Sequence, residues 1–435
     1  MTLLEAIGRQ TGENAVRLHT PGHSGKRCAL PFGLFLDFDL TELPGIGSLY
    51  DGFGPIRQSE QKAERLFGTR RTLFSAGGCT LCIQTMLALA VQSGVKQILF
   101  SRNLHRSVIN TAALLDITPR FMYPENGRIT PAVLETALTS NPEAGAVTVT
   151  SPDYYGRISD IAGLKKVCKK FSVPLFVDNA HGSHLWCFGI HPTALGADMC
   201  ADSPHKTLPV LTGGAWLHIN NPAFERAKQA EALFGSTSPS FPVLASLEMC
   251  VDWLAKEGKQ AFVTLAGKTA YLYEFAKKIG FGVFGGGGES DPVRLTLDAN
   301  PLGYTGTQAA EILAQNGAQA EFADHQAVVM ILTPFHRSAD LARLKKALMA
   351  VRQKKPVYTP EIPFIQAKTA LTPRQALLAK NRSVPVKNAV GKIAAQAVCP
   401  CPPGIPIVIP GEQISPEAVD AIFEAGIGEV NIICV

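Results

Sequence analysis

From about residue 55, the chain alternates between stretches with helical periodicity and short runs of apolar or β-branched residues. This alternation is typical of helices that cross over a mostly parallel sheet. The short runs are nearly all apolar, as expected for strands that are covered on both faces. The predicted strands lie near 71–75, 97–101, 120–123, 146–150, 174–178, 198–202 and 215–219, and helices are predicted over about 57–67, 80–92 and 246–278. The pattern therefore predicts an α/β domain built on a central sheet.

The glycine run Gly285 to Gly288 then breaks the periodicity and indicates a change of unit. Beyond it, the pattern predicts strands near 293–297, 319–323, 327–332 and 406–409, helices over about 338–352 and 386–398, and an extended segment at 354–363. We therefore expect an N-terminal segment at 1–54, a large domain at 55–284 and a smaller α+β domain at 285–435.

Length and composition narrow the function classes. A chain of 435 residues exceeds what one core usually supports, so a cleft between domains is plausible. Its 46% hydrophobic and 18% charged residues, with a net charge of +5 and no basic tract, make nucleic acid a poor candidate partner. The opening residues lack the order of a signal peptide, and no apolar run reaches the roughly 18 residues needed to span a bilayer. We expect a cytoplasmic protein with reduced cysteines.

Two features at the ends of predicted strands could hold a phosphorylated cofactor. The turn Ser75 to Thr80 precedes a helix, where exposed N–H groups and the positive helix end can cradle a phosphate, although a Gly-Gly turn is more often only a turn. Asp178 ends a buried strand and could pair with a protonated ring nitrogen, which keeps a pyridine cationic. The alternative for Asp178 is a helix cap or a surface turn.

A lysine and a histidine follow two other predicted strands. Lys206 lies between apolar strands, so its amine could lose its proton near neutrality and attack a carbonyl. Ser203 and His205 beside it could bind phosphate oxygens, which favours a cofactor-binding lysine over an ordinary surface lysine at this position. The flat imidazole of His105 could stack on a planar cofactor.

The cysteines and histidines do not predict a metal. Cys79 and Cys82 form a C-x-x-C, but no second cysteine pair lies nearby, so we interpret them as small apolar residues at a helix start. His181, His184 and Cys187 could supply three ligands, yet their spacing matches no common zinc pattern.

Seven segments, in order, resemble the Orn/Lys/Arg decarboxylase family of fold-type-I pyridoxal-phosphate (PLP) enzymes. They lie at 18–23 (LHTPGH), 39–43 (DLTEL), 151–156 (SPDYYG), 178–182 (DNAHG), 203–209 (SPHKTLP), 402–406 (PPGIP) and 410–412 (PGE). The resemblance runs nearly end to end. It implies an aspartate aminotransferase-like large domain with a mostly parallel central sheet, and PLP as the cofactor.

The resemblance also implies roles for individual residues. Lys206 would hold PLP as a Schiff base, Asp178 would pair with the pyridine nitrogen, and His105 would stack on the ring with Ala180 on the opposite face. Phosphate would be held at the helix start and by the Ser203 side of the site. The full predicted cofactor set is Gly77, Gly78, Cys79, Thr80, His105, Asp178, Ala180, His181, Ser203, His205 and Lys206, and the catalytic residues among them are Lys206, Asp178 and His105.

Four departures from the family pattern bear on the substrate. Asn179 replaces a glutamate, Asp153 a threonine, Cys401 a tyrosine, and Gln396 a glutamate. An acid that paired with a substrate amine or guanidinium could therefore be missing. The phosphate turn also carries Gly78 and Cys79 where hydroxyl residues are usual, which keeps the backbone N–H groups.

The implied function is decarboxylation of lysine, ornithine or arginine to the corresponding amine and CO₂, a reaction of polyamine metabolism. Two alternatives stay open: another fold-type-I reaction on a less basic amino acid, either an aminotransferase or a lyase, and a PLP-binding protein without turnover. The family also implies a homodimer or higher homo-oligomer. The flexible, aromatic arm at 45–53 is the expected contact with a second copy.

Overall fold

The computed structural model describes residues 1–12, 35–224, 226–284, 290–359, 364–400 and 403–434. The chain forms two compact units, one of residues 1–95 with 168–259 and the other of 96–167 with 260–435. The boundaries at 54 and 284 that the sequence suggested stay a prediction. Within the described ranges, every helix is too short or too polar to span a bilayer.

The first unit contains four strands of the central sheet, in the order β1 (Arg71–Ser75), β7 (Ala215–Ile219), β6 (Met199–Asp202) and β5 (Leu175–Asn179). Strands β5 and β6 are parallel, and β7 runs antiparallel to both β6 and β1. Every residue of β5, β6 and β7 is buried. Cover on both faces explains why these strands are such continuous apolar runs.

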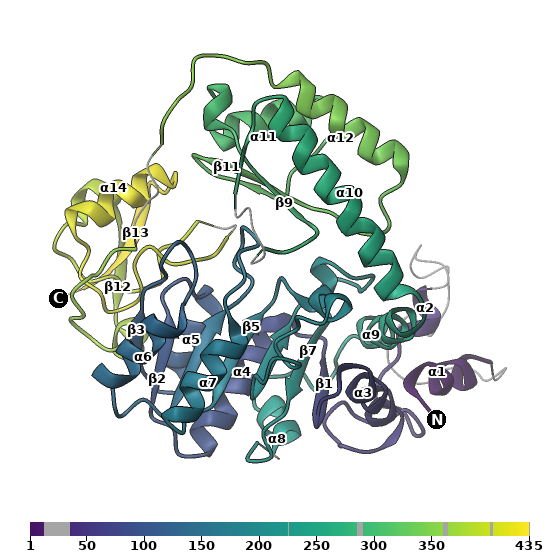
Figure 1. Cartoon of the computed structure of the whole chain (residues 1–435). Helices are drawn as coiled ribbons and strands as arrows, with labels where there is room; N and C mark the ends of the chain where they lie inside the picture. Colours follow the sequence, from purple (N-terminus) through teal and green to yellow (C-terminus); the bar gives the residue numbers. More distant parts are fainter. Residues whose placement is uncertain (13–34, 225, 285–289, 360–363, 401–402, 435) are drawn as a thin grey trace. The chain divides into compact units, whose positions relative to one another are not determined.

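Helices cover this part of the sheet. Helix α4 (Gly78–Gln92) packs on β6 and β7, and α3 (Gly54–Phe67) and α9 (Phe241–Trp253) pack on β1 (Figure 1). Helix α4 buries residues around its whole circumference because almost all of its side chains are apolar. The unit also contains α1 (Leu3–Gly12), α2 (Phe35–Phe38), η1 (Ser183–Phe188), η2 (Pro204–Lys206), α8 (Ala227–Ala232) and η3 (Leu254–Gly258).

The second unit contains three strands in the order β4 (Ala146–Thr150), β2 (Gln97–Ser101) and β3 (Thr118–Met122), all parallel. Helix α5 (Arg106–Leu114) connects β2 to β3 and α6 (Pro131–Ser140) connects β3 to β4, while α7 (Ile161–Lys170) follows β4. Parallel neighbours joined by helices are the crossover arrangement that the hydrophobic pattern predicted.

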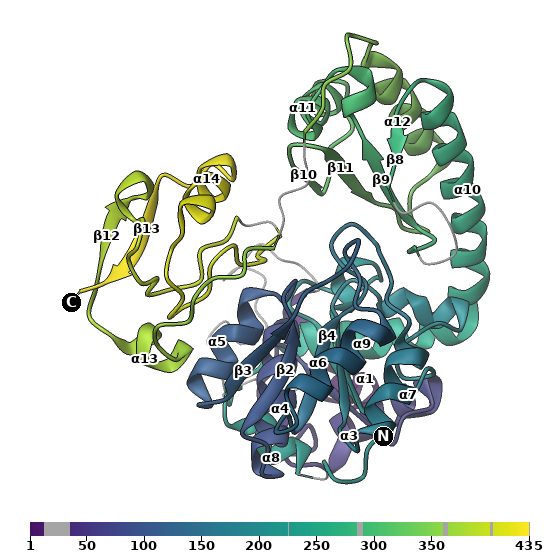
Figure 2. The ribbon, with the colours of Figure 1, turned by 60° about the vertical axis from the view of Figure 1, so that its left-hand side comes forward.

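An antiparallel sheet follows later in the same unit. Its strands run in the order β10 (Phe322–Ala323), β11 (Ala327–Ile331), β9 (Arg294–Asp298) and β8 (Gly282–Val283). Figure 2 shows α10 beside this sheet, and α11 packs on β11 and α12. The helical segments here are α10 (Lys259–Lys278), η4 (Asn300–Leu302), α11 (Gly306–Gln315) and α12 (Ser338–Ala350).

The C-terminal part has an antiparallel pair of strands, β12 (Asn381–Pro385) and β13 (Glu429–Ile433). Its helical segments are α13 (Pro373–Leu378), η5 (Val386–Asn388) and α14 (Pro416–Glu424). The helix predicted over 386–398 is wrong, since only its first three residues are helical. Gly391 adopts a left-handed φ of 75°, and Ile393 and Ala394 then form bridges to other segments. The strand predicted at 406–409 is also wrong, because only Val408 forms a bridge.

Candidate active site

Lys206 and Asp178 lie in one site, at the ends of neighbouring parallel strands of the first unit. Asp178 is near the end of β5, and Lys206 is in η2, which follows β6. The carboxyl ends of parallel strands share one edge of a sheet, which is where open α/β folds place ligands. Lys206 Nζ lies 3.0 Å from His181 Nε2. The amine and the imidazole can therefore share a proton.

Asp178 is a buried acid that the lysine faces. Its carboxylate is 3% exposed, and Oδ1 accepts a hydrogen bond from the N–H of Ala180 at 3.2 Å. Burial raises the pKa of Asp178, and the charge of Lys206 opposes this rise. The thiol of Cys79 lies 4.0 Å from the same oxygen. The carboxylate of Asp178 is therefore positioned to pair with a bound cation.

The N-terminus of α4 opens next to these residues. Gly77 donates its N–H to Ser75 Oγ at 3.1 Å, and Gly78 donates to the carbonyl of Gly213 at 2.8 Å. Among the described contacts, no side chain caps this helix, and Thr80 in its first turn is exposed. A helix end with uncapped N–H groups attracts an anion such as phosphate.

His205 and Ser203 lie on the η2 side of the site. His205 Nδ1 is 2.8 Å from the carbonyl of Gly214, so Nδ1 carries the proton and Nε2 keeps its lone pair. Burial lowers the pKa of His205, which favours this neutral form. Ser203 forms a side-chain hydrogen bond with Cys79. The structure thus brings both residues to the Lys206 site.

His105 belongs to the second unit, where it caps α5. Its Nδ1 accepts the N–H of Ser107 at 3.2 Å and lies 2.8 Å from Ser107 Oγ. The other edge of the ring lies against Gly404, because a Cβ added there would be 2.7 Å from Nε2. The ring is therefore fixed on both edges. Its stacking on a cofactor stays a prediction.

Asp153, the unexpected acid of the SPDYYG segment, is satisfied within its own turn. Oδ1 accepts the N–H groups of Tyr155 and Arg157 at 3.0 and 2.8 Å, and Oδ2 accepts Arg157 Nε at 2.6 Å. The side chain is 4% exposed. Asp153 therefore stabilises a turn and offers no unpaired acid to a substrate.

The remaining predicted residues fall into two groups. His181, His184 and Cys187 do not form a ligand cluster, and the group of this kind within the described ranges is instead His191, Cys200 and Asp202. Cys79 and Cys82 are free thiols and lie in the first turns of α4, the helix start at which the sequence placed them. The motif at 18–23 and Cys401 lie outside the described residues.

Arg102 is a residue that sequence reasoning missed. It is 1% exposed and donates to the carbonyls of Pro406 and Ile407 at 2.7 and 2.9 Å. The same guanidinium lies 3.4 Å from Glu412 Oε2. Arg102 precedes His105 by three residues, so it ties the His105 loop to the PPGIP and PGE segments. An arginine directly after an apolar strand was the available signal.

Comparisons with known proteins match nearly the whole chain. The family model described as the major domain of Orn/Lys/Arg decarboxylase matches residues 3–270, and the model of its C-terminal domain matches 352–423. An arginine decarboxylase of Bacillus subtilis is 30% identical over 97% of this chain and 93% of its own length. The constitutive lysine decarboxylase of Escherichia coli is 21% identical over 92% of this chain and 73% of its own.

A solved structure also shares the fold. The lysine decarboxylase of Francisella novicida aligns with a TM-score of 0.81 at 17% identity, over 99% of this chain and 81% of that one. This likeness confirms the predicted α/β fold with a mostly parallel sheet and a smaller C-terminal part.

Proposed function

Because this chain belongs to the Orn/Lys/Arg decarboxylase family, we propose that it removes CO₂ from arginine. It is a PLP-dependent amino-acid decarboxylase of fold type I. What supports arginine over lysine is the order of similarity. Relatives named arginine decarboxylase reach 29 to 30% identity, whereas those named lysine decarboxylase reach 21%.

The residues of the first unit fit PLP. The buried carboxylate of Asp178 suits a protonated ring nitrogen, the amine of Lys206 suits the aldehyde, and the uncapped start of α4 suits the phosphate. When bound, PLP supplies an electron sink for the pair that CO₂ leaves behind. We assign to these three places the cofactor contacts of Asp178, Lys206 and the Gly78 to Thr80 turn. Ser203 and His205 are assigned to the phosphate side and Ala180 to one ring face, while the stacking of His105 on the ring stays a prediction from the sequence.

Lys206 and His181 handle protons in this proposal. The 3.0 Å contact between Nζ and Nε2 lets the ammonium donate to the imidazole, or a protonated imidazole donate to the free amine. An amine must be unprotonated to attack a carbonyl. His181 can therefore take the proton that Lys206 has to lose, and return it later.

A screen for CO₂ release tests the reaction and the substrate together. The purified protein with PLP is offered arginine, lysine, ornithine and less basic amino acids. We expect CO₂ from arginine, with a kcat/KM at least about tenfold above that for lysine, the ratio equivalent to about 1.4 kcal/mol. Release of a keto acid would indicate an aminotransferase. Bound cofactor without turnover of any amino acid would indicate a binding protein.

The Lys206→Ala variant tests the assignment of the cofactor lysine. We expect it to lose both the absorbance of covalently held cofactor and turnover, the latter by more than about a thousandfold, because the Lys206 amine is the group assigned to bind the aldehyde. Lys392→Ala, at an exposed lysine, is the matched control and should retain both. Full turnover in Lys206→Ala would show that the assignment is wrong.

We also propose that the active form is a homodimer or a multiple of it. The support is the arm at 45–53, whose Ile46 and Leu49 are buried while the aromatic ring of Phe53 is 70% exposed. A large exposed aromatic side chain on an anchored arm is a good candidate for a contact with a second copy. Light scattering on the active protein tests this, and Phe53→Ser should shift the equilibrium toward monomer. An active monomer would contradict the proposal.

A further inference from the structure

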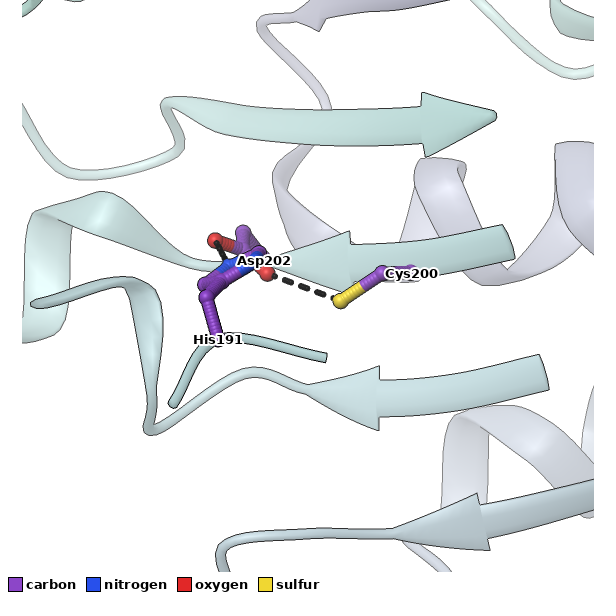
Figure 3. Close-up of side chains that lie close together, drawn as sticks. All are labelled: His191, Cys200 and Asp202. Atoms are coloured by element: carbon purple, nitrogen blue, oxygen red, sulfur yellow. Dashed lines mark hydrogen bonds and ion pairs between the residues drawn. The ribbon is translucent and has the colours of Figure 1, made fainter. Parts of the chain in front are cut away.

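A second acid, Asp202, lies on the opposite face of the sheet from Asp178. Successive side chains of a strand point to opposite faces, so Asn179 of β5 points away from the side of Asp178. Asn179 is in register with Asp202 of the parallel neighbour β6. Figure 3 shows Asp202 with Cys200 of the same strand and with His191. The sheet therefore carries two carboxylates back to back.

Asp202 is surrounded by hydrogen-bond donors. Its Oδ1 accepts Asn179 Nδ2 at 2.7 Å and the Cys200 thiol at 3.3 Å, and its Oδ2 lies 2.9 Å from His191 Nε2. His218 Nε2 of β7 lies 3.6 Å from the same Oδ2. All five side chains are fully buried. Water is thus not needed to satisfy the acid.

The hydrogen bonds of His191 argue against a metal ion in this cluster. Its Nδ1 accepts the backbone N–H of Thr193 at 3.3 Å, and a backbone N–H can only donate. The Thr193 hydroxyl, 2.8 Å from Nδ1, can donate to it as well. Nε2 lies 3.1 Å from Asn179 Nδ2 and 2.9 Å from Asp202 Oδ2, and we assign the proton to Nε2 because a carboxylate oxygen can only accept. A protonated ring nitrogen cannot ligate a metal. The cluster is a carboxylate held by N–H and S–H donors.

These donors keep Asp202 ionised. Burial alone would raise the pKa of Asp202, but the His191 and His218 imidazoles outweigh burial and hold it well below its usual range. The same acid acts on Asp178, whose pKa burial raises, Lys206 and the Ala180 N–H lower, and Asp202 raises again. A carboxylate accepting several hydrogen bonds is stable as the anion even without solvent.

We propose that Asp202 is a fixed anion, a permanently ionised carboxylate on the opposite face of the sheet from Asp178. Its negative charge stabilises the proton shared by Asp178 and the ring nitrogen of PLP. This inference rests on the proposed PLP function and makes Asp202 a positioning residue, because it acts through Asp178. The groups that face Asp178 are Cys79 from α4 and Lys206 from η2, whereas the charge of Asp202 acts on Asp178 from the opposite face of the sheet. Those that face Asp202 are Cys200, His191, His218 and the amide of Asn179.

The protonation of the ring nitrogen can be measured directly. Holoenzyme is prepared with PLP that carries ¹⁵N in the ring, and its ¹⁵N chemical shift is followed with pH. In Asp202→Asn we expect the ring nitrogen to lose its proton on the order of one pH unit lower than in the wild type, the effect of removing one charge a strand away at an effective dielectric constant of about 20. Cys200→Ala keeps the charge of Asp202 and should titrate like the wild type.

The outcomes separate the two proposals. If the wild-type chain bound no PLP, the proposed function would be wrong. If the wild type bound PLP and decarboxylated arginine but Asp202→Asn titrated identically, only the role of Asp202 would be overturned.

Two measurements on the wild-type holoenzyme keep the inference testable if Asp202→Asn does not fold. The ¹³C signal of the Asp202 carboxyl should remain that of an ionised acid at every pH at which the protein is folded. A carboxyl that titrated in the usual range would contradict the fixed anion. Stoichiometric zinc or another transition metal in the purified protein would also overturn it, since the donors would then be ligands.

Discussion

The imidazole of His105 and the α-carbon of Gly404 are packed so closely that no side chain fits between them. A Cβ at Gly404 would lie 2.7 Å from Nε2 and 2.8 Å from Cδ2 of the ring. The backbone is tied as well, since the N–H of Arg106 donates to the Gly404 carbonyl at 2.9 Å. Gly404 lies in the segment matched by the C-terminal family model. That domain therefore determines where the His105 ring lies.

Gly404→Ala should displace the His105 ring. If the ring stacks on PLP, we expect the affinity for PLP to fall about tenfold, the equivalent of about 1.4 kcal/mol, since a stacked ring contributes energy of that order. The measurement is a titration of the apoprotein with PLP, followed by cofactor absorbance.

Gly391→Ala is the matched control for that experiment. Gly391 has the same φ of 75°, so alanine causes the same backbone strain, but a Cβ there meets no atom within 4 Å. Both variants should lose about 1 to 2 kcal/mol of stability from the left-handed backbone. Equal PLP affinity in the two variants would show that Gly404 does not act through His105.

Arg102 and Glu412 should differ in how much their removal costs. Arg102→Ala leaves a buried carboxylate without its cation and removes two hydrogen bonds to backbone carbonyls, so we expect a loss of about 3 to 5 kcal/mol in the free energy of unfolding. Glu412→Gln keeps an oxygen that can accept the N–H of Ile409, and should cost about 1 to 3 kcal/mol. Urea unfolding measures both. Equal losses would mean that the ion pair with Glu412 accounts for nearly all that Arg102 contributes, and would contradict a contribution from its hydrogen bonds to the carbonyls.

The hydrophobic pattern predicted the fold best where strands are buried. Strands β1, β2, β4 and β7 begin and end at the predicted residues, and at least four of the five residues of each are buried. Strand β3 was predicted two residues late, since its edge position exposes Thr118 and Arg120 and weakens the apolar signal. The false helix at 386–398 has apolar residues at helical spacing, yet they are buried by pairing with distant segments. Periodicity does not reveal such long-range pairing.

The site was predictable where residues follow one another in motifs. Lys206 and Asp178 each lie in a short segment with a recognisable pattern, and the structure brings them together. The cluster around Asp202 could not be predicted from a local motif, because its partners His191 and His218 lie 11 and 16 residues away on other elements. The surroundings of Asp153 could not be predicted for the same reason, because only the structure shows its ion pair with Arg157, and its effect on specificity stays open.

Asp153→Asn should affect stability and leave substrate preference unchanged. The amide oxygen can still accept the N–H groups of Tyr155 and Arg157, but the ion pair with Arg157 Nε is lost in a site that is 4% exposed. We expect a loss of about 1 to 3 kcal/mol in the free energy of unfolding. The ratio of kcat/KM for arginine to that for lysine should stay within about twofold of the wild type. A reversal of that ratio would place Asp153 in substrate recognition.

A buried cluster of α3 and α8 should make stability depend on pH. Lys228 Nζ lies 2.5 Å from Glu60 Oε1 and 3.1 Å from Glu231 Oε2, so two carboxyl groups share one ammonium group. Burial raises the pKa of Glu231 to about 7, with Lys228 opposing the rise and Glu60 adding to it. One carboxyl group of the cluster therefore holds a proton at mildly acidic pH.

The sign of the pH effect follows from the direction of this shift. Because the pKa of Glu231 is higher in the folded state than its usual 4.5, the contribution to stability is full below about 4.5 and is lost as the pH rises through about 7. At about 1.4 kcal/mol per pKa unit, the loss amounts to about 3 kcal/mol. Glu231→Gln, which cannot ionise, should not show it. The difference in unfolding free energy between wild type and variant, measured in urea from about pH 5 to about pH 8, should therefore fall as the pH rises to about 7 and level off above it. Glu424→Gln, at an exposed acid, is the control, and its difference from the wild type should not depend on pH. If the difference for Glu231→Gln were equally independent of pH, Glu231 would be ionised throughout this range.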